Sequence, residues 1–345
     1  MIIVISNRLI NDNRNDENFL GEILNPQGAD KITIAKAFYQ ENQKSWLIEP
    51  VSKNDNLTAE NPSIKQLFLE IIKGIENNTF SRKWVFYIPG FNQSSRHALD
   101  SSRRLSVQYD VNVILFSWPS NPQGNSNSLK DFFEAESEYR EALSIAKSSA
   151  ITLAKVFTTL SQWIEDSSLD NLSRQRIKFT LLSHSLGNYV VENTTLNLVS
   201  SKVADFFDSI ILHQADVDNP KHEQWINKIK LSKNIYITVN RHDFILTISG
   251  AFHKFRLNNL NVNNRLGNNT KDFTAQKAIY IDFTKGGQVQ KAHDLLFDVS
   301  NPIVINFIKQ IFKGNSPFIS NRPFKQSDTQ PNVYRLDQDF KSLEE

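Results

Sequence analysis

From residue 84 onward, short apolar runs alternate with longer amphipathic stretches along the chain. The runs at 84–88, 111–116, 179–182, 235–239 and 279–283 are mostly apolar, as is typical of parallel strands buried on both faces, and 207–213 is predicted as a further strand. The stretches at about 94–108, 129–165, 186–198 and 302–312 have the apolar spacing of helices. This alternation predicts an α/β fold with a mostly parallel central sheet and helices on both faces.

The two ends of the chain have a different pattern. Runs at 2–6, 31–38 and 45–48 are predicted as strands, the last two antiparallel, and a helix is predicted at about 63–76. Residues 314–345 are polar and contain three prolines, which indicates a tail that is partly ordered against the body. We therefore predict a single domain over 1–313, with N-terminal strands in 1–55, a core at 84–296, and a polar C-terminal tail at 314–345.

The turn around Ser185 carries the clearest chemical signal. It follows the apolar run 179–182 and precedes a helix, and its neighbours Ser183 and Gly187 are small. A serine with small residues two positions away on each side is typical of a nucleophile elbow, in which a tight turn holds the hydroxyl at a strand end. The free N–H groups of the following helix favour an oxyanion at the same place.

Two residues that follow other strands are candidate partners, because ligands in open α/β sheets bind at the carboxyl ends of the strands. Asp243 comes after the run 235–239, and His293 comes after the run 279–283 and a loop. His293 would accept the proton of Ser185 and later pass it to the leaving group. Asp243 would hold the imidazole in one tautomer and stabilise its charged form.

The oxyanion is expected to be held by two backbone amides, those of Phe91 and Leu186. Leu186 directly follows the serine, and Phe91 lies in the loop after the run 84–88, where Gly90 allows a close approach. The residues predicted to contact substrate are Gly90, Asn92, Trp118, His184 and Phe244. The aromatic side chains of Trp118 and Phe244, together with Phe91, Leu295 and Leu296, would form an apolar rim around the site. The ordinary alternative is that these aromatic residues belong to the core.

Asp216 and Asp218 also follow a strand and are the alternative to Asp243 as the acid. Each member of the set also has an ordinary structural interpretation. Ser185 and Asp243 could be helix caps, and His293 could be a surface histidine. The order of the three residues and their places at strand ends favour the catalytic interpretation.

The order Ser–Asp–His is that of the α/β-hydrolases, and the chain resembles a bacterial α/β-hydrolase family of unknown function. In that family a His-Gly-Phe-Asn loop precedes the serine elbow. The matching segments are 85–92, 116–120, 182–187, Asp216-Val217-Asp218, Asp243 with Arg265-Leu266-Gly267, His293-Asp294, and the N-terminal strand that ends in Asn7-Arg8. The resemblance implies the α/β-hydrolase fold and a Ser185–Asp243–His293 triad.

The chain departs from that family at three places. Pro89 stands where the usual loop has His, Ser183 replaces the commoner Gly of the elbow, and the stretch around 258–264 is longer than usual. None of these changes removes a member of the triad. We therefore expect the site to be intact.

Composition narrows the classes of function. The chain has 345 residues, a formal net charge of +2 and no cysteine, which excludes disulfides, thiolate metal sites and a cysteine nucleophile. The charge balance and the lack of a basic block do not favour nucleic acid. The N-terminus does not resemble a signal peptide, and no run reaches the ~18 apolar residues of a membrane span. We predict a cytoplasmic protein.

The sequence thus predicts a serine hydrolase that cleaves a carboxylic ester or thioester, with a small-molecule or lipid ester as substrate and neither metal nor cofactor. The alternative is a binding or scaffold protein on a hydrolase fold, without turnover. The helical stretch 129–165 and the Asn-rich excursion 257–269 are predicted as scaffold and solvent loop. A lid or a partner surface is the alternative for both.

Overall fold

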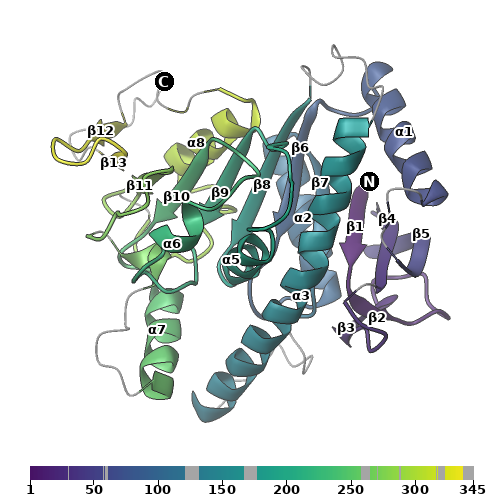
Figure 1. Ribbon diagram of the computed structural model, residues 1–345, viewed down its shortest axis with the longest axis horizontal. Helices are drawn as coiled ribbons and strands as arrows, with labels where there is room; N and C mark the ends of the chain where they lie inside the picture. The colour runs from purple at the N-terminus through teal and green to yellow at the C-terminus, as the bar shows by residue number, and fades with distance from the viewer. Residues whose placement is uncertain are drawn as a thin grey trace.

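An eleven-stranded sheet runs through the middle of the computed structural model (Figure 1). In spatial order its strands are β12 (Phe324–Gln326), β13 (Val333–Leu336), β11 (Ala278–Asp282), β10 (Ile235–Val239), β9 (Ser209–His213), β8 (Lys178–His184), β6 (Lys83–Ile88), β7 (Asn112–Ser117), β1 (Ile2–Ser6), β4 (Lys31–Gln40) and β5 (Ser45–Asn56). The structure describes residues 1–29, 31–56, 58, 61–120, 132–166, 177–257, 265–269, 271–286, 289–315, 317 and 323–336.

All neighbouring strands from β13 to β1 run parallel, whereas the pairs β1–β4, β4–β5 and β12–β13 are antiparallel. The predicted mostly parallel sheet is therefore confirmed. A separate two-stranded hairpin, β2 (Arg8–Ile10) and β3 (Leu20–Leu24), follows β1 and was not predicted.

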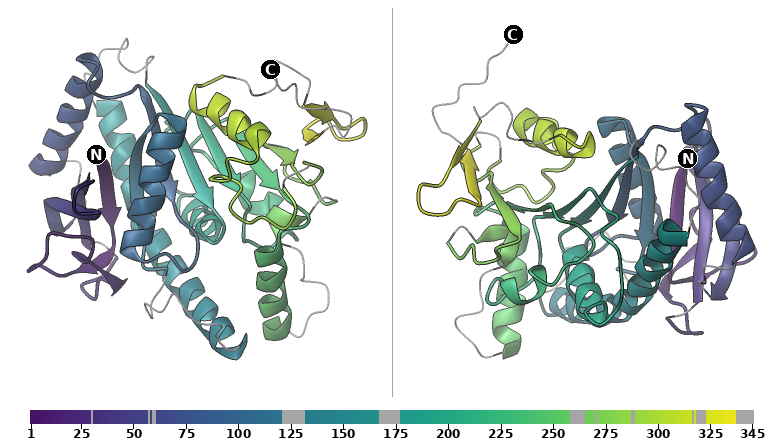
Figure 2. Two further views of the ribbon diagram at one scale, coloured as in Figure 1. Left: turned by 180° about the vertical axis from the view of Figure 1, so that it is seen from behind. Right: turned by 45° about the horizontal axis from the view of Figure 1, so that its top comes forward.

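Helices cover both faces of the sheet. One face carries α3 (Phe132–Asp166), α5 (Gly187–Asn197) and the short α6 (Glu223–Ile226), and the opposite face carries α2 (Ser95–Tyr109) and α8 (Pro302–Phe312) (Figures 1 and 2). Helix α1 (Pro62–Glu76) packs beside β5. The first turns of α3 and the whole of α7 (Phe244–Leu257) extend below the carboxyl edge of the sheet in Figure 1. Within the described residues, no helix is both long and apolar enough to cross a bilayer.

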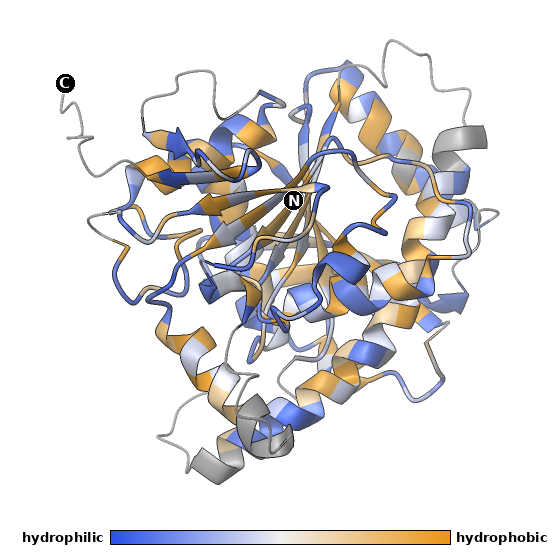
Figure 3. Cartoon of the chain, turned by 60° about the vertical axis from the view of Figure 1, so that its left-hand side comes forward, coloured by the Kyte–Doolittle hydropathy of each residue, from blue (hydrophilic) through white to orange (hydrophobic). Residues whose placement is uncertain are grey.

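The two layers form because side chains alternate between the faces along each strand. In β6, Phe86 and Ile88 belong to the apolar cluster that includes α3, while Val85 and Tyr87 belong to the cluster that includes α2. All four are almost fully buried, so from Val85 to Ile88 the strand is apolar at every position rather than at every second one. The apolar strands lie between helices that turn polar residues outward (Figure 3).

The C-terminal tail forms two strands that the sequence did not predict. The polar tail contributes β12 and β13, and β13 pairs parallel with β11, with Val333 opposite Tyr280 and fully buried. The tail is therefore partly a structural part of the sheet, because Val333 packs into one apolar layer and Leu336 into the other. Helix α7 was not predicted. Residues 121–131 and residues 258–264 of the predicted excursion 257–269 lie outside the described residues.

One buried arginine ties the N-terminal hairpin to the loops at the carboxyl edge. The side chain of Arg8, at the start of β2, has no exposed surface and forms an ion pair with Glu22. Its guanidinium also donates to four other groups, namely Ser117 Oγ at 3.0 Å, Gly21 O at 3.0 Å, Gln93 O at 2.9 Å and Trp118 O at 2.7 Å. Arg8 thus satisfies the carbonyls of both loops that follow β6 and β7.

We predict that Arg8→Met lowers the free energy of unfolding by about 3 kcal/mol, because it leaves Glu22 and several buried acceptors without a donor. Arg14→Met is the matched control, since Arg14 pairs with Asp16 at the surface and should cost less than about 1 kcal/mol. Urea denaturation of the three proteins measures both values. Equal midpoints for Arg8→Met and the wild type would contradict the role of this side chain.

Candidate active site

Ser185 lies on the turn between β8 and α5 in a backbone conformation that few non-glycine residues adopt. Its φ is 52°, in the left-handed region. The turn is held by hydrogen bonds from Ser185 N to His213 O (3.1 Å) and from Asn188 Nδ2 to Ser185 O (2.9 Å). A Cβ atom at Gly187 would lie 2.6 Å from the carbonyl oxygen of Ile88, so only glycine fits there. The small flanking residues therefore have the steric cause expected from the sequence.

Three side chains that are far apart in sequence meet at this turn. His293 Nε2 lies 2.9 Å from Ser185 Oγ, and His293 Nδ1 lies 2.8 Å from Asp243 Oδ2. Because an ionised carboxylate only accepts, Nδ1 carries the proton and Nε2 is left to accept the serine proton. Ser185 is 5% exposed, Asp243 is fully buried, and the His293 side chain keeps 17% of its surface exposed. His293 is therefore the most exposed of the three side chains, and Ser185 keeps only a small exposed surface.

Asp243 also caps a helix, in addition to its contact with His293. Its Oδ1 accepts a hydrogen bond from Leu246 N at 3.0 Å in the first turn of α7, while its Oδ2 faces His293. The capping bond fixes the rotation of the carboxylate. One oxygen is thereby directed at the imidazole.

The loop after β6 lies against the serine. A Cβ atom at Gly90 would be 2.8 Å from Ser185 Cβ, so the absence of a side chain allows this approach. Within the described part of the chain, the N–H groups of Phe91 and Leu186 form no hydrogen bond. Leu186 is the N-cap of α5, whose dipole adds partial positive charge. Two free donors beside a nucleophile can hold an oxyanion.

The residues predicted to contact substrate fall into two groups. Phe244 is 53% exposed at the start of α7, Asn92 is exposed in the loop with a φ of 60°, and Phe91 is half-buried. Trp118, Leu295 and Leu296, in contrast, have no exposed surface. Trp118 instead donates its indole N–H to Pro89 O at 2.9 Å. We therefore assign Trp118 to the support of the loop and remove it, with the two leucines, from the apolar rim.

His184 supports the histidine loop. Its Nε2 donates to His293 O at 2.9 Å, and its ring lies between those of His293 and His213. Burial, and next the repulsion from the protonated form of His293, lower the pKa of His184 below its ordinary value. A neutral His184 is consistent with a supporting role beside the base.

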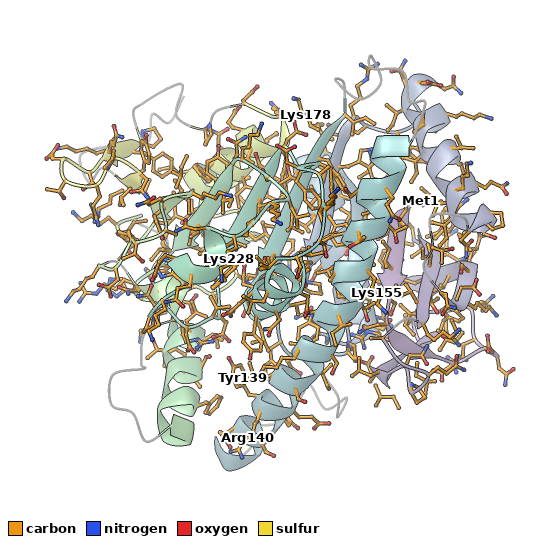
Figure 4. All side chains as sticks on the ribbon, viewed as in Figure 1. Met1, Tyr139, Arg140, Lys155, Lys178 and Lys228 are labelled. Carbon is orange, nitrogen blue, oxygen red and sulfur yellow. The ribbon has the colours of Figure 1, made fainter. Side chains whose placement is uncertain are left out.

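The alternative acid, Asp216, is occupied elsewhere. Its carboxylate accepts from Arg265 Nε at 2.6 Å, from Ser249 Oγ at 2.5 Å and from Tyr139 OH at 2.8 Å. Asp218 pairs with the same guanidinium. Tyr139 lies near the lower end of α3 (Figure 4), and its hydroxyl oxygen lies 2.9 Å from Ser249 Oγ of α7. This buried cluster joins α3, α7 and the loop after β9, and it places Asp216 in a structural role.

Sequence reasoning missed Gln214 and Asn240, which directly follow β9 and β10. Gln214 Nε2 donates to Asp243 Oδ2 and to Ala292 O, and Asn240 Nδ2 also donates to Ala292 O. Their position just past a strand was the available signal, although an uncharged amide has no distinctive spacing. Within the described residues, no group of three or more His, Cys, Asp or Glu side chains could hold a metal ion.

Comparison with known proteins gives one finding. A family model described as an alpha/beta hydrolase of unknown function (DUF900) matches residues 70–310, more than half of the chain. This span contains Ser185, Asp243 and His293 and begins after the N-terminal strands. No curated protein matches the chain.

Asp216→Asn should lower the free energy of unfolding by about 3–5 kcal/mol at pH 7, because it removes the main partner of buried Arg265. Burial raises the pKa of Asp216, but Arg265 and the hydrogen bonds from Ser249 and Tyr139 outweigh burial and hold the pKa below its ordinary value. The contribution is therefore present above the unfolded-state pKa of about 4 and is lost as the pH falls through the folded-state pKa.

Urea denaturation of the wild type and Asp216→Asn between about pH 3 and pH 7 measures this dependence. The two stabilities should converge at the acid end. Asp218→Asn is the matched control: its side chain is 46% exposed, and the change should cost about 1 kcal/mol or less. An Asp216→Asn protein as stable as the wild type at pH 7 would contradict the structural role.

Proposed function

We propose, since the chain belongs to this family of α/β-hydrolases of unknown function, that it is a serine hydrolase that cleaves a carboxylic ester or thioester. The family supports hydrolytic chemistry in general. The proposal of an acyl-enzyme mechanism rests on the side chains around Ser185.

The observation that carries the proposal is the continuous chain of contacts from Ser185 Oγ through His293 to buried Asp243, at 2.9 and 2.8 Å. A serine hydroxyl is a weak nucleophile until a base removes its proton, and an imidazole with one tautomer fixed is such a base. The left-handed φ of Ser185 supports the same interpretation, because backbone strain of this kind is concentrated at functional sites.

In the proposed first step, Ser185 Oγ attacks the carbonyl carbon while its proton passes to His293 Nε2. The oxyanion accepts hydrogen bonds from Phe91 N and Leu186 N. The bond to the leaving oxygen or sulfur then breaks, and His293 passes the proton to that atom. Water, deprotonated by His293, attacks the acyl-enzyme in the second step and releases the acid and free Ser185. Asp243 stays ionised and stabilises the imidazolium throughout.

The substrate is proposed to carry an apolar acyl or aryl group, either as a small molecule or as a lipid ester. Phe244 is more than half exposed beside Asp243, and Phe91 is half-buried beside Ser185. Apolar surface at a site that leaves the chemistry to a few polar groups favours an apolar ligand over a sugar or a phosphate. The near-neutral charge of the chain gives no reason to propose a nucleic acid.

A fluorophosphonate probe tests the nucleophile without knowledge of the substrate, because Oγ attack on phosphorus forms a stable bond and expels fluoride. The wild type should be labelled and Ser185→Ala should not, while Ser144→Ala, an exposed serine of α3, should be labelled like the wild type. Wild-type protein that fails to react under conditions that label a known esterase would favour the alternative, a scaffold without turnover.

Asp243→Asn should slow the labelling of folded protein by orders of magnitude, on the scale of ~10⁴, because the asparagine favours the wrong tautomer of His293. The measurement is the second-order labelling rate, with circular dichroism to establish that the variant is folded. A normal rate in Asp243→Asn together with a loss in folded Asp216→Asn would transfer the role of the acid to Asp216.

A further inference from the structure

The side-chain amide of Gln214 lies between Asp243 and the loop that carries His293. Gln214 is fully buried. Its Nε2 donates to Asp243 Oδ2 at 2.6 Å and to Ala292 O at 2.9 Å, and its Oε1 accepts from Leu295 N at 3.1 Å. One side chain therefore binds the candidate acid and the residues on either side of His293-Asp294.

The orientation of this amide is fixed by its partners. Asp243 Oδ2 and Ala292 O can only accept, and Leu295 N can only donate. A rotation of the amide by 180° would place Oε1 against two acceptors and Nε2 against a donor. The native orientation is therefore the one in which a donor points at the carboxylate oxygen that faces His293.

The backbone of Gln214 is held in an uncommon conformation, with a φ of 41°. Gln214 N donates to Thr238 Oγ1 at 3.1 Å, and Gly267 packs so closely that a Cβ there would overlap the backbone of Gln214 and Ala215. Gly267 N donates in turn to Ala215 O at 2.9 Å. The surrounding structure thus imposes a strained backbone at this residue, which is a reason to look for a functional role.

Two other side chains hold the same loop but form no hydrogen bond with Asp243 among the described residues. Asn240 Nδ2 donates to Gln290 O and Ala292 O, and His184 Nε2 donates to His293 O. Of these three side chains, Gln214 alone combines support of the loop with a hydrogen bond to the carboxylate. This difference separates a role in chemistry from a role in packing.

We propose that Gln214 is a positioning residue for the Asp243–His293 pair. The inference rests on the proposed serine hydrolase function and goes beyond it. The amide donates to Asp243 Oδ2 and so stabilises the ionised carboxylate in the rotation that faces His293 Nδ1. Through Ala292 and Leu295 it also sets the distance between the imidazole and Ser185.

The pH dependence of the labelling rate is the readout that a merely structural role would not change. The titratable and charged groups around His293 are Asp243, Asp294, His184, His213 and Lys291. Gln214 is uncharged, so Gln214→Glu adds one carboxyl group of nearly equal shape directly against Asp243. When the new carboxyl ionises, it replaces a neutral donor by a second negative charge, and that charge favours the imidazolium.

The experiment measures the rate of fluorophosphonate labelling between about pH 5 and pH 9 for the wild type, Gln214→Glu, Gln214→Leu and Asn240→Ala. Gln214→Leu should react about 10- to 100-fold more slowly, as expected for the loss of a hydrogen bond to a charged group. Gln214→Glu should move the acidic limb of the profile to higher pH by about one unit. Asn240→Ala should lower the rate and leave the acidic limb at the wild-type pH.

The outcomes separate this inference from the proposed function. If the wild type is not labelled at Ser185, the proposed function fails. If the wild type is labelled and both Gln214 variants keep its rate and acidic limb, only the positioning role is overturned. The positioning role is also overturned if Asn240→Ala moves the acidic limb of the profile as far as Gln214→Glu does. The pH of the limb would then depend on the position of the loop and not on the hydrogen bond to Asp243. Should Gln214→Leu fail to fold, the near-isosteric Gln214→Glu still decides the question.

Discussion

The structure around the candidate site depends on the need to satisfy one fully buried carboxylate, that of Asp243. An ionised group without exposed surface must be paired and hydrogen-bonded, and its donors come from three places in the fold. Leu246 N belongs to α7, Gln214 follows β9, and His293 belongs to the loop after β11. Because these elements are neighbours only when β9, β10 and β11 pair side by side, the sheet order determines whether the site exists.

A second buried ion pair orders the walls of the site. Asp216 and Arg265 connect to Tyr139 on α3 and to Ser249 on α7, the two helices that extend past the carboxyl edge of the sheet. The ring of Tyr139 contacts Phe91 edge-to-face, with 5.6 Å between centroids. These contacts thus connect the candidate oxyanion donor Phe91 with helices α3 and α7 and with the loop after β9. Arg8 supports the neighbouring loops from the other side.

The sequence was most informative where the local environment permits only one kind of residue. The continuous apolar runs predicted the parallel strands, because a strand buried on both faces cannot alternate, and Gly187 marked a turn that excludes any side chain. The serine, aspartate and histidine were predicted as a set because their order and strand-end positions agree.

Asp216 shows where prediction from sequence fails. It follows a strand as a catalytic acid would, and only its contact with Arg265, 49 positions away, shows that its carboxylate is already paired. Trp118 was misplaced because burial of an aromatic side chain depends on tertiary packing. Gln214 was missed because an amide has no distinctive spacing, and β13 because its apolar positions lie in a polar segment.

Ser185 is proposed to form a covalent acyl-enzyme with help from His293 and Asp243. Intact-mass and peptide mass spectrometry after brief mixing with a p-nitrophenyl ester would detect this intermediate. We expect a mass increase equal to the acyl group, located on the peptide that contains Ser185, which then decays as water releases the acid. Ester cleavage with the adduct on a different residue, or an unmodified Ser185 peptide while p-nitrophenol is released in a burst, would contradict it.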